Sequence, residues 1–343
     1  MTTSAKANLR NPRSKRPARP VHIVGTGSFV PDRVLSNADL EKMVDTTDEW
    51  ITSRSGIKER RIAPDWMCTS DMATEAARRA MEQAGIRENE IDLIICATVT
   101  PDMPFPNTAC FVQQKLGLRR IPAFDIEAAC SGFLYGLEIG QQFITSGTCD
   151  TVLVIGAEKL SSIVDWQDRN TCVLFGDGAG AAILRSRGDE HGILTTCMGA
   201  DGGQTDILSL PGGGARFPAS KETVSARMHF LKMEGKEVFK NAVIAMQTAA
   251  EEALKKCNLN IADIKCIIPH QANVRIIDAI ADRLGAPKEK IYINLHRYGN
   301  ISAASVAIAL DEAAREGRFQ RGDLILLVVF GAGLTWASCV IQW

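Results

Sequence analysis

Apolar residues occur along the chain in short β-branched runs that are bounded by glycine or aspartate. The clearest runs are Val21–Val24, Leu93–Ala97, Val152–Ile155 and Leu324–Val329. Near-continuous apolar strands of this length are typical of a sheet that is buried on both faces. Between them, apolar residues recur at helical spacing, most clearly over Asp71–Ala84 and Lys240–Lys256. This alternation of strands and helices predicts an α/β layered fold.

Two long segments resemble each other after a constant shift. Ala76–Ile95 matches Ala249–Ile268 at an offset of 173 positions, with six identical residues and the same passage from amphipathic helix to buried strand. Val154–Ala157 parallels Val329–Ala332 at an offset of 175. Matches at nearly one offset indicate an internal duplication. We therefore expect a first half over residues 21–190 and a second half over residues 191–343, with functional sites where their strand ends face each other.

Composition and charge narrow the function classes. A length of 343 residues corresponds to about two domains. Lys and Arg (39) nearly balance Asp and Glu (40), which argues against a protein built to bind the phosphate backbone of nucleic acids. No apolar run reaches the roughly 18 residues of a membrane span. Ten cysteines without any CxxC pair give little support to a zinc or thioredoxin motif and fit a reducing, cytoplasmic compartment.

The first twenty residues differ from the rest of the chain. They contain six basic residues, no acidic residue and almost no large apolar side chain. No apolar segment follows the charges, so a secretory signal peptide is not predicted. A solvated, disordered tail is the simplest interpretation, and an organelle transit peptide or a partner-binding arm are the alternatives.

Cys130 stands out among the ten cysteines because of its surroundings. An apolar strand from Ala123 gives way to small residues, and an apolar helical run follows Gly132. At the start of a helix, unpaired backbone N–H groups and the helix dipole favour the reactive thiolate. The alternative is a buried cysteine that packs as a small hydrophobe, which is the interpretation we give to Cys96 and Cys266.

Three further segments follow predicted strands or open a helix. His270, in the sequence Pro-His-Gln-Ala-Asn, comes directly after a repeated strand, although an isolated histidine is often a surface or capping residue. Asn300 precedes an Ala-rich helix predicted over Ala303–Glu316. Taken alone, this segment is explained by a structural role, in which Asn300 or Ser302 caps the N-terminus of the helix. The Gly-Ala-Gly run around Ala332 can direct backbone N–H groups at an oxyanion, or it can be a tight turn.

Taken together, these residues resemble a known family. A Cys at a helix start, followed by His in P-H-Q-A-N and Asn in G-N-x-S-A-A-S, is similar to the thiolase-fold condensing enzymes, and most similar to the β-ketoacyl-acyl-carrier-protein synthase III family. The resemblance runs from about Val21 to Trp343. Supporting segments are Asp48–Ile57, Phe175–Gly180 and Phe330–Trp336. It implies a thiolase-like fold: two duplicated α/β halves in a layered αβαβα arrangement.

The resemblance also implies an enzymatic reaction. Cys130 would take the acyl group of an acyl-CoA, and malonyl-acyl-carrier protein would then lose carbon dioxide and attack the acyl-cysteine, giving a 3-oxoacyl-carrier protein. His270 and the Asn300 amide would donate hydrogen bonds to the enolate oxygen, because an asparagine amide exchanges no proton near neutral pH. The backbone N–H groups of Cys130 and Ala332 would hold the oxyanion of each tetrahedral step. No metal or other cofactor is expected.

Residues matching the family's binding positions are carried over in the same way. Trp50 would stack on the adenine of coenzyme A, unless it is only a partly buried helix-face aromatic. The residues expected to bind coenzyme A are Thr46, Trp50, Arg54, Arg169, Gly235, Phe239 and Asn273. Lys240 and Arg275 would dock the acidic carrier protein through a local basic patch. Phe105 would cross a homodimer interface to close the partner's acyl pocket.

Two departures and two alternative functions remain open. Ala332 and Asn170 stand where relatives often have glycine. An alanine at 332 still offers its backbone N–H, whereas Asn170 puts the loop around the nucleotide in doubt.

A thiolase-fold acyltransferase or secondary-metabolite synthase would pass the acyl group to another acceptor. A non-catalytic carrier-binding protein would be expected to lack the nucleophile. The acyl primer is not predicted from the sequence.

Overall fold

The computed structural model describes residues 19–188 and 192–343 and contains two main sheets. The first sheet has the strand order β1-β7-β6-β4-β5, in which β4 is parallel to both β5 and β6, and β7 is antiparallel to its two neighbours. Its strands are β1 (Val21–Phe29), β4 (Leu93–Ala97), β5 (Ala123–Ile126), β6 (Thr151–Lys159) and β7 (Asp177–Ser186).

The second sheet repeats this topology. It has the order β11-β12-β13-β8, with the first pair parallel and the other two antiparallel, as in β4-β6-β7-β1. An isolated parallel bridge from Ile267 to Ile291 lies on the outer side of β11, where β5 lies in the first sheet. The strands are β8 (Gly192–Ala200), β11 (Cys266–Pro269), β12 (Leu324–Gly331) and β13 (Thr335–Gln342). The predicted duplication is confirmed, whereas the junction at 190/191 falls outside the described residues and stays a prediction.

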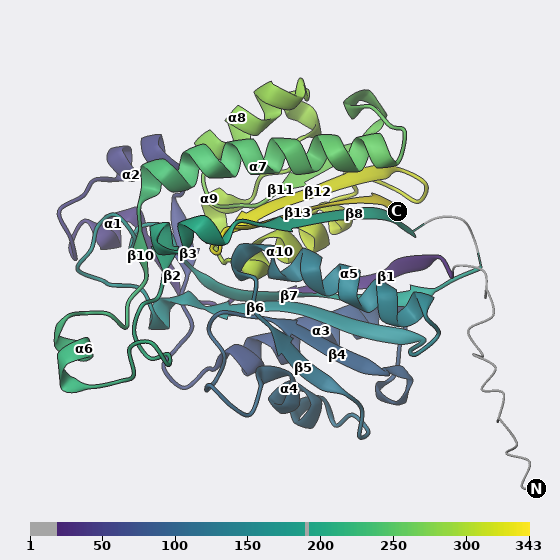
Figure 1. Cartoon of the computed structure of the whole chain (residues 1–343), viewed down its shortest axis with the longest axis horizontal. Helices are drawn as coiled ribbons and strands as arrows, with labels where there is room; N and C mark the ends of the chain where they lie inside the picture. The colour runs from purple at the N-terminus through teal and green to yellow at the C-terminus, as the bar shows by residue number, and fades with distance from the viewer. Residues whose placement is uncertain (1–18, 189–191) are drawn as a thin grey trace, which may run out of the picture.

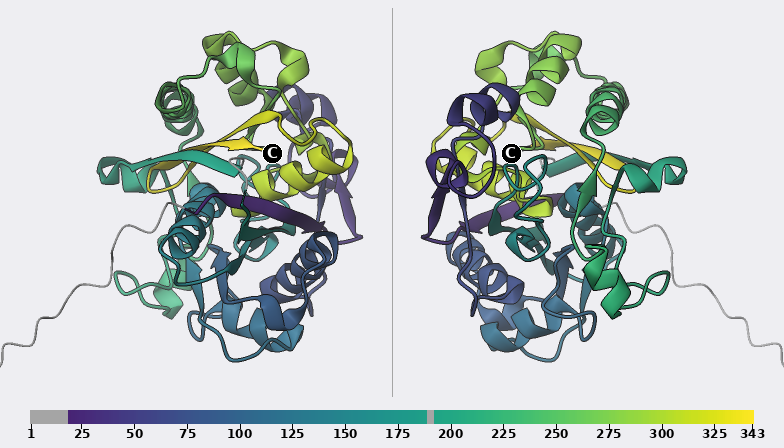
Figure 2. Two further views of the ribbon diagram at one scale, coloured as in Figure 1. Left: turned by 90° about the vertical axis from the view of Figure 1, so that its right-hand side faces the viewer. Right: turned by 90° about the vertical axis from the view of Figure 1, so that its left-hand side faces the viewer.

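Helices form three layers around the two sheets (Figure 1). α3 (Thr69–Ala84) and α4 (Thr108–Leu116) pack on the outer face of the first sheet, and α7 (Gly235–Lys256) and α8 (Val274–Leu284) on the outer face of the second. α5 (Gly132–Thr145) and α10 (Ala303–Arg315) lie between the sheets, within one core cluster that draws residues from both. Views from the two sides show the same order of layers (Figure 2). The predicted αβαβα arrangement is confirmed.

Shorter elements lie around the ends of the central strands. The small strands are β2 (Val34–Ser36), β3 (Glu59–Arg61), β9 (Leu208–Ser209) and β10 (Lys232–Met233). The short helices are α1 (Asn37–Leu40), α2 (Asp48–Ser55), α6 (Lys221–Ser225) and α9 (Leu295–Tyr298). Turns of 3-10 helix cover Glu88–Glu90, Ala129–Ser131, Leu160–Ser162, Gly202–Ile207, Ile261–Asp263 and Lys288–Lys290. Of these elements, α2, β9, β10 and the turns at 129–131, 160–162 and 202–207 contribute residues to the wall of the cavity described below.

Observed elements extend beyond the apolar runs that predicted them. β1 continues to Phe29. Gly27 within it leaves room for α3, since a Cβ there would lie 2.3 Å from the Ala80 nitrogen. α3 and α7 begin two and five residues before their predicted starts. No helix in the described ranges is both long and apolar enough to cross a membrane. The predicted basic tail lies outside the described residues except for Arg19 and Pro20.

Candidate active site

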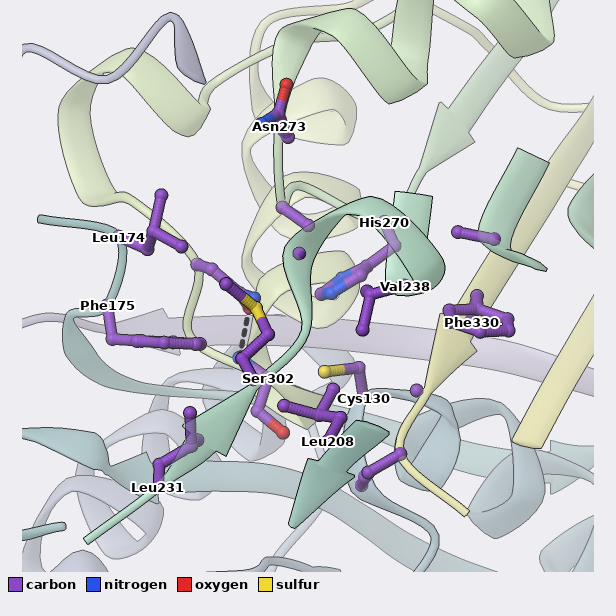
Figure 3. Close-up of a pocket in the computed structure, with 18 of the residues that line it drawn as sticks. Cys130, Leu174, Phe175, Leu208, Leu231, Val238, His270, Asn273, Ser302 and Phe330 are labelled. Carbon is purple, nitrogen blue, oxygen red and sulfur yellow. Dashed lines mark hydrogen bonds between the residues drawn. The ribbon is translucent and has the colours of Figure 1, made fainter. Parts of the chain in front are cut away.

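A cavity of about 980 Å³ opens between the two halves, where their strands end (Figure 3). Its wall combines residues 50–55, 127–130 and 160–175 of the first half with residues 205–246, 270–276, 300–302 and 330–333 of the second. Ten of the fourteen residues predicted for the site line it: Trp50, Arg54, Cys130, Gly235, Phe239, His270, Asn273, Arg275, Asn300 and Ala332. Thr46, Phe105, Arg169 and Lys240 do not line the cavity. The structure thus brings together residues that lie up to 282 positions apart in the sequence.

Cys130 lies in the 3-10 turn Ala129–Ser131, immediately before α5. Ala129 adopts a left-handed backbone conformation with φ of 46°. The β12 loop packs directly on the turn, since a Cβ at Gly331 would lie 2.7 Å from the Cys130 nitrogen. Burial raises the pKa of the Cys130 thiol to about 12, against the opposing effect of the Ser302 hydroxyl. Contrary to our expectation from the helix start, the resting sulfur is therefore a protonated thiol, because desolvation outweighs the favourable backbone dipoles.

His270 follows β11 and is only 4% exposed. Its backbone N–H donates to the Val328 carbonyl at 2.8 Å, which continues the pairing of β11 with β12 by one residue. Its Nδ1 atom is buried and has no hydrogen-bond partner in the described residues. Burial lowers the pKa of the imidazole to about 4, so the ring is neutral at physiological pH and has one N–H to donate. His270 is therefore buried in the cavity and is neither a surface nor a capping residue.

Asn300 is fixed by the backbone of the other half. Its N–H donates to the Leu174 carbonyl at 2.8 Å, and its carbonyl accepts from Gly176 N–H at 3.0 Å. The side-chain oxygen accepts a hydrogen bond from the Ser302 N–H at 2.8 Å, so the amide nitrogen is left to face the cavity. Ser302 occupies the N-cap position of α10 with φ of 45°, but no side chain caps this helix. The capping interpretation of Asn300 and Ser302 is therefore wrong.

The glycine loop joins β12 to β13 beside the nucleophile turn. Ala332 and its two glycine neighbours line the cavity. The Thr335 hydroxyl lies 3.0 Å from the Ala128 carbonyl oxygen and 3.1 Å from the Ala332 carbonyl oxygen, so it connects the loop to the turn that carries Cys130. A loop held against the nucleophile in this way can present a backbone N–H to a developing oxyanion.

Cationic and aromatic side chains surround the outer part of the cavity. The guanidinium carbons of Arg54 and Arg169 lie 5.6 and 5.4 Å from the centre of the Trp50 ring. Arg169 also donates to the Asp45 carbonyl at 2.8 Å, which holds it beside Trp50 although it does not line the cavity. Asn170 lines the wall, but its amide donates to Asp168 within the same loop at 3.1 Å. This arrangement suits an aromatic, anionic ligand such as a nucleotide.

Most of the apolar wall of the cavity, and two polar residues of the site, were not predicted from the sequence. The apolar residues include Val99, Leu160, Ile163, Phe175, Leu208, Leu231 and Met246. Glu158 is fully buried at the end of β6, and Ser302 lines the cavity beside Asn300. The sequence contains one indication of Glu158, because this acidic residue directly continues the apolar run Val152–Ala157. Burying a carboxylate costs free energy, so a buried acidic residue indicates a functional role.

The five layers, the internal repeat and the cavity between the two halves define a thiolase-fold enzyme. Residues 124–202 match the family "3-Oxoacyl-[acyl-carrier-protein (ACP)] synthase III", and residues 254–343 match its C-terminal family. The chain belongs to the beta-ketoacyl-[acyl-carrier-protein] synthase III family, whose members are condensing acyltransferases that initiate fatty acid synthesis.

Individual relatives support this assignment over nearly the full chain. The beta-ketoacyl-[acyl-carrier-protein] synthase III of Caldanaerobacter subterraneus subsp. tengcongensis is 59% identical, covering 94% of this chain and 97% of the relative. The crystal structure of 3-oxoacyl-[acyl-carrier-protein] synthase III from Aquifex aeolicus is 49% identical, with a TM-score of 0.88 over 94% of this chain and all of that one. A priming beta-ketosynthase from the R1128 polyketide pathway is 36% identical, with a TM-score of 0.89 over 96% and 98% of the two chains.

Proposed function

We propose that Cys130, His270 and Asn300 carry out the condensation in two stages. The observation that supports this most directly is that the three side chains line one cavity. The Ser302 N–H donates to the side-chain oxygen of Asn300, so the amide nitrogen remains as the donor. In the first stage, the Cys130 sulfur attacks the acyl-CoA carbonyl, the bond to the coenzyme A sulfur breaks, and the acyl group stays on Cys130. Backbone N–H groups of Cys130 and Ala332 stabilise the tetrahedral oxyanion.

In the second stage, malonyl-acyl-carrier protein takes the place of coenzyme A. Its carboxylate leaves as carbon dioxide, and the electron pair forms an enolate whose oxygen accepts hydrogen bonds from His270 and Asn300. The enolate carbon attacks the acyl-cysteine, which releases the 3-oxoacyl-carrier protein and the Cys130 thiolate. A neutral imidazole is sufficient for this role, because it carries one N–H that can donate to the enolate oxygen. The chemistry requires no metal, since the departing group is a neutral gas.

Substrate contacts extend this proposal to the rim. Trp50, Arg54 and Arg169 would bind the nucleotide end of coenzyme A, and Gly235, Phe239, Asn273 and Thr46 its pantetheine arm. Arg275 lies over the Phe239 ring at 5.9 Å, and both Arg275 and Lys240 are exposed near the opening. An acidic carrier protein would dock on these cations. Thr46 has a buried hydroxyl without a hydrogen-bond partner in the described residues, but it does not line the cavity.

A homodimer forms part of the proposal. Phe105 is 84% exposed and lies outside the cavity of the single chain, an unusual position for a large aromatic side chain. We expect it to pack against the acyl pocket of a second copy. A cytoplasmic location stays a prediction, as does the absence of a cofactor; no cluster of three metal-ligating side chains occurs in the described ranges.

Acyl transfer and decarboxylation can be measured separately. Incubation with acetyl-CoA followed by mass spectrometry should add one acetyl group to the wild type at Cys130, and none to Cys130→Ser at this site. His270→Ala and Asn300→Ala should still be acylated but should release carbon dioxide from malonyl-acyl-carrier protein at least about a hundredfold more slowly. Retained turnover in Cys130→Ser, or unchanged decarboxylation in both other variants, would contradict the roles assigned here.

A further inference from the structure

The acylation step leaves one proton without an assigned acceptor. The resting Cys130 is a thiol, and its proton must leave before or as the sulfur attacks the acyl-CoA. His270 is the nearest obvious base, but burial lowers its pKa to about 4, so it binds a proton weakly. A group with a pKa nearer to physiological pH would accept the proton more readily.

Glu158 is a buried carboxyl group that the mechanism so far does not use. It has no exposed surface, and its Oε2 atom accepts hydrogen bonds from the Thr100 hydroxyl at 2.6 Å, the Thr100 N–H at 3.1 Å and the Thr98 hydroxyl at 3.2 Å. The Val99 N–H lies 3.1–3.2 Å from both oxygens. Oε2 thus has a full set of hydrogen-bond donors. Oε1 has only the Val99 N–H, which it shares with Oε2, and can accept a further hydrogen bond.

Packing directs the Glu158 side chain towards the start of α10. Side chains alternate along a strand, so residues 156 and 158 of β6 face the same side. That side contacts α10 closely, because a Cβ at Gly156 would lie 2.6 Å from the Ala303 carbonyl oxygen. The nucleophile turn meets the same point, because a Cβ at Gly132 would lie 3.6 Å from the Ala303 Cβ.

Ser302 immediately precedes this contact and lines the cavity together with Cys130 (Figure 3). It is 3% exposed, and its buried hydroxyl makes no hydrogen bond of standard geometry in the described residues. Burial raises the pKa of both Cys130 and Glu158, and the Ser302 hydroxyl opposes the shift in each group. A hydroxyl that can donate on one side and accept on the other is suited to pass a proton.

We propose that the Ser302 hydroxyl passes the Cys130 proton to Glu158 Oε1 during acylation, and returns it when condensation frees the thiolate. On acylation, the S–H bond of Cys130 breaks, Ser302 accepts this proton and gives its own to Glu158, and the sulfur electron pair forms the new thioester. The coenzyme A thiolate leaves and takes a proton from solvent. On condensation, the Cys130 sulfur recovers its electron pair, and the proton returns along the same path. This inference rests on the acyl-Cys130 step proposed above.

The electrostatic surroundings agree with this role. Burial raises the pKa of Glu158 to about 7, whereas the donors from Thr98, Val99 and Thr100 oppose the shift. The titratable groups that interact with its charge are the thiols of Cys130 in the nucleophile turn and Cys96 in β4. The neighbouring Lys159 points away, because its ammonium group donates to the carbonyls of Pro64 and Met67. No ion pair neutralises Glu158 in the described residues, so it can take up a proton near pH 7.

Glu158→Gln is the most direct test. The amide oxygen can replace Oε2 as the acceptor of the Thr98 and Thr100 hydrogen bonds, while the NH2 group faces Ser302 and cannot accept a proton. In the wild type, the rate of acylation by acetyl-CoA should fall as the pH decreases through about 7, since the carboxylate form is required. In Glu158→Gln this inflection should disappear, and the rate at pH 8 should fall about a hundredfold. Ser302→Ala should lose a similar factor.

Three controls separate this role from others. Decarboxylation of malonyl-acyl-carrier protein needs no Cys130 proton, so both variants should retain it within about threefold, whereas general damage to the cavity would lower it. Asp177→Asn, a buried carboxylate with a raised pKa outside this cavity, should acylate normally. Alkylation of Cys130 by iodoacetamide also requires the sulfur to lose its proton, so it should slow in Glu158→Gln, whereas weaker binding of acyl-CoA alone would leave it unchanged.

Parallel decreases in alkylation and acylation are therefore expected. Acylation of Glu158→Gln at or above the wild-type rate between pH 6 and 9 would overturn the relay and leave only an electrostatic effect. A wild-type protein that cannot be acylated at Cys130 at all would instead refute the proposed function.

Discussion

Replacing Asn300 by aspartate isolates the amide donor with little change of shape. The Asn300 side-chain oxygen accepts from Ser302 N–H at 2.8 Å, and an aspartate oxygen can keep this bond. The other oxygen then faces the cavity as an acceptor where the amide nitrogen was a donor. Loss of one preorganised donor to a developing oxyanion slows reactions by about 10²–10³, which corresponds to roughly 2.7–4 kcal/mol. We expect decarboxylation of malonyl-acyl-carrier protein by Asn300→Asp to fall by at least this factor at pH 8.

The pH dependence of the variant adds a second signature. Burial raises the pKa of a carboxyl group, and the protonated form can donate a hydrogen bond. Decarboxylation by Asn300→Asp should therefore recover partly as the pH is lowered from 8 to 6, relative to the wild type at each pH. Carbon dioxide release can be followed with a coupled assay, while acetylation of Cys130 is measured in parallel by mass spectrometry and should change less than about threefold.

Asn300→Ala provides the matched control for stability. It removes the acceptor of the buried Ser302 N–H, and an unpaired buried donor costs about 1–3 kcal/mol. Its thermal unfolding should therefore occur at a lower temperature than that of Asn300→Asp. Decarboxylation by Asn300→Asp within tenfold of the wild type at pH 8, or a parallel loss of acetylation, would refute the assignment of Asn300 as a donor to the enolate.

Three further expectations concern packing, pH and carrier docking. Gly156→Ala places a methyl group 2.6 Å from the Ala303 carbonyl oxygen and should lower the free energy of unfolding by about 1–3 kcal/mol in urea denaturation, whereas Gly202→Ala, in open space, should change it little. The pKa of His270 is about 4 in the folded chain, below the ordinary 6.5, so the unfolded chain binds more protons between these two pH values. The free energy of unfolding of the wild type should therefore fall by up to about 3 kcal/mol as the pH decreases from 6.5 to 4, and that of His270→Asn should fall by less. Lys240→Glu should reduce kcat/KM for malonyl-acyl-carrier protein about tenfold at low salt, less at high salt, and leave malonyl-CoA unaffected.

The sequence predicted the layers because buried strands and amphipathic helices carry regular patterns. It did not predict β7, whose sequence Asp177–Ser186 is rich in glycine and alanine and therefore lacks an apolar run. Small residues are required there because α10 packs tightly on this strand; a Cβ at Gly180 would lie 2.5 Å from the Ala307 Cβ. Patterns of hydrophobicity report burial, but they do not report how closely two backbones approach.

Most of the candidate site was predictable for a different reason. Cys130, His270 and Asn300 occupy strand ends and helix starts, and each lies in a distinctive short motif. Their ionisation was not predictable, because it depends on desolvation by residues that are distant in the sequence. The thiol of Cys130 is protonated at rest for this reason, despite its place before a helix. Glu158 could be noticed from the sequence as an acidic residue that continues an apolar run, but only the fold shows which groups surround it.

Asn300 is held by main-chain hydrogen bonds to Leu174 and Gly176, which belong to the other half of the chain. The amide that we propose to activate the second substrate is thus oriented only after the two halves have docked. Each half alone, even if it were fully folded, would contain chemical groups without their working orientation. If Asn300 has the proposed role, decarboxylation of malonyl thioester requires the two halves to be docked, and this activity then reports complete tertiary assembly.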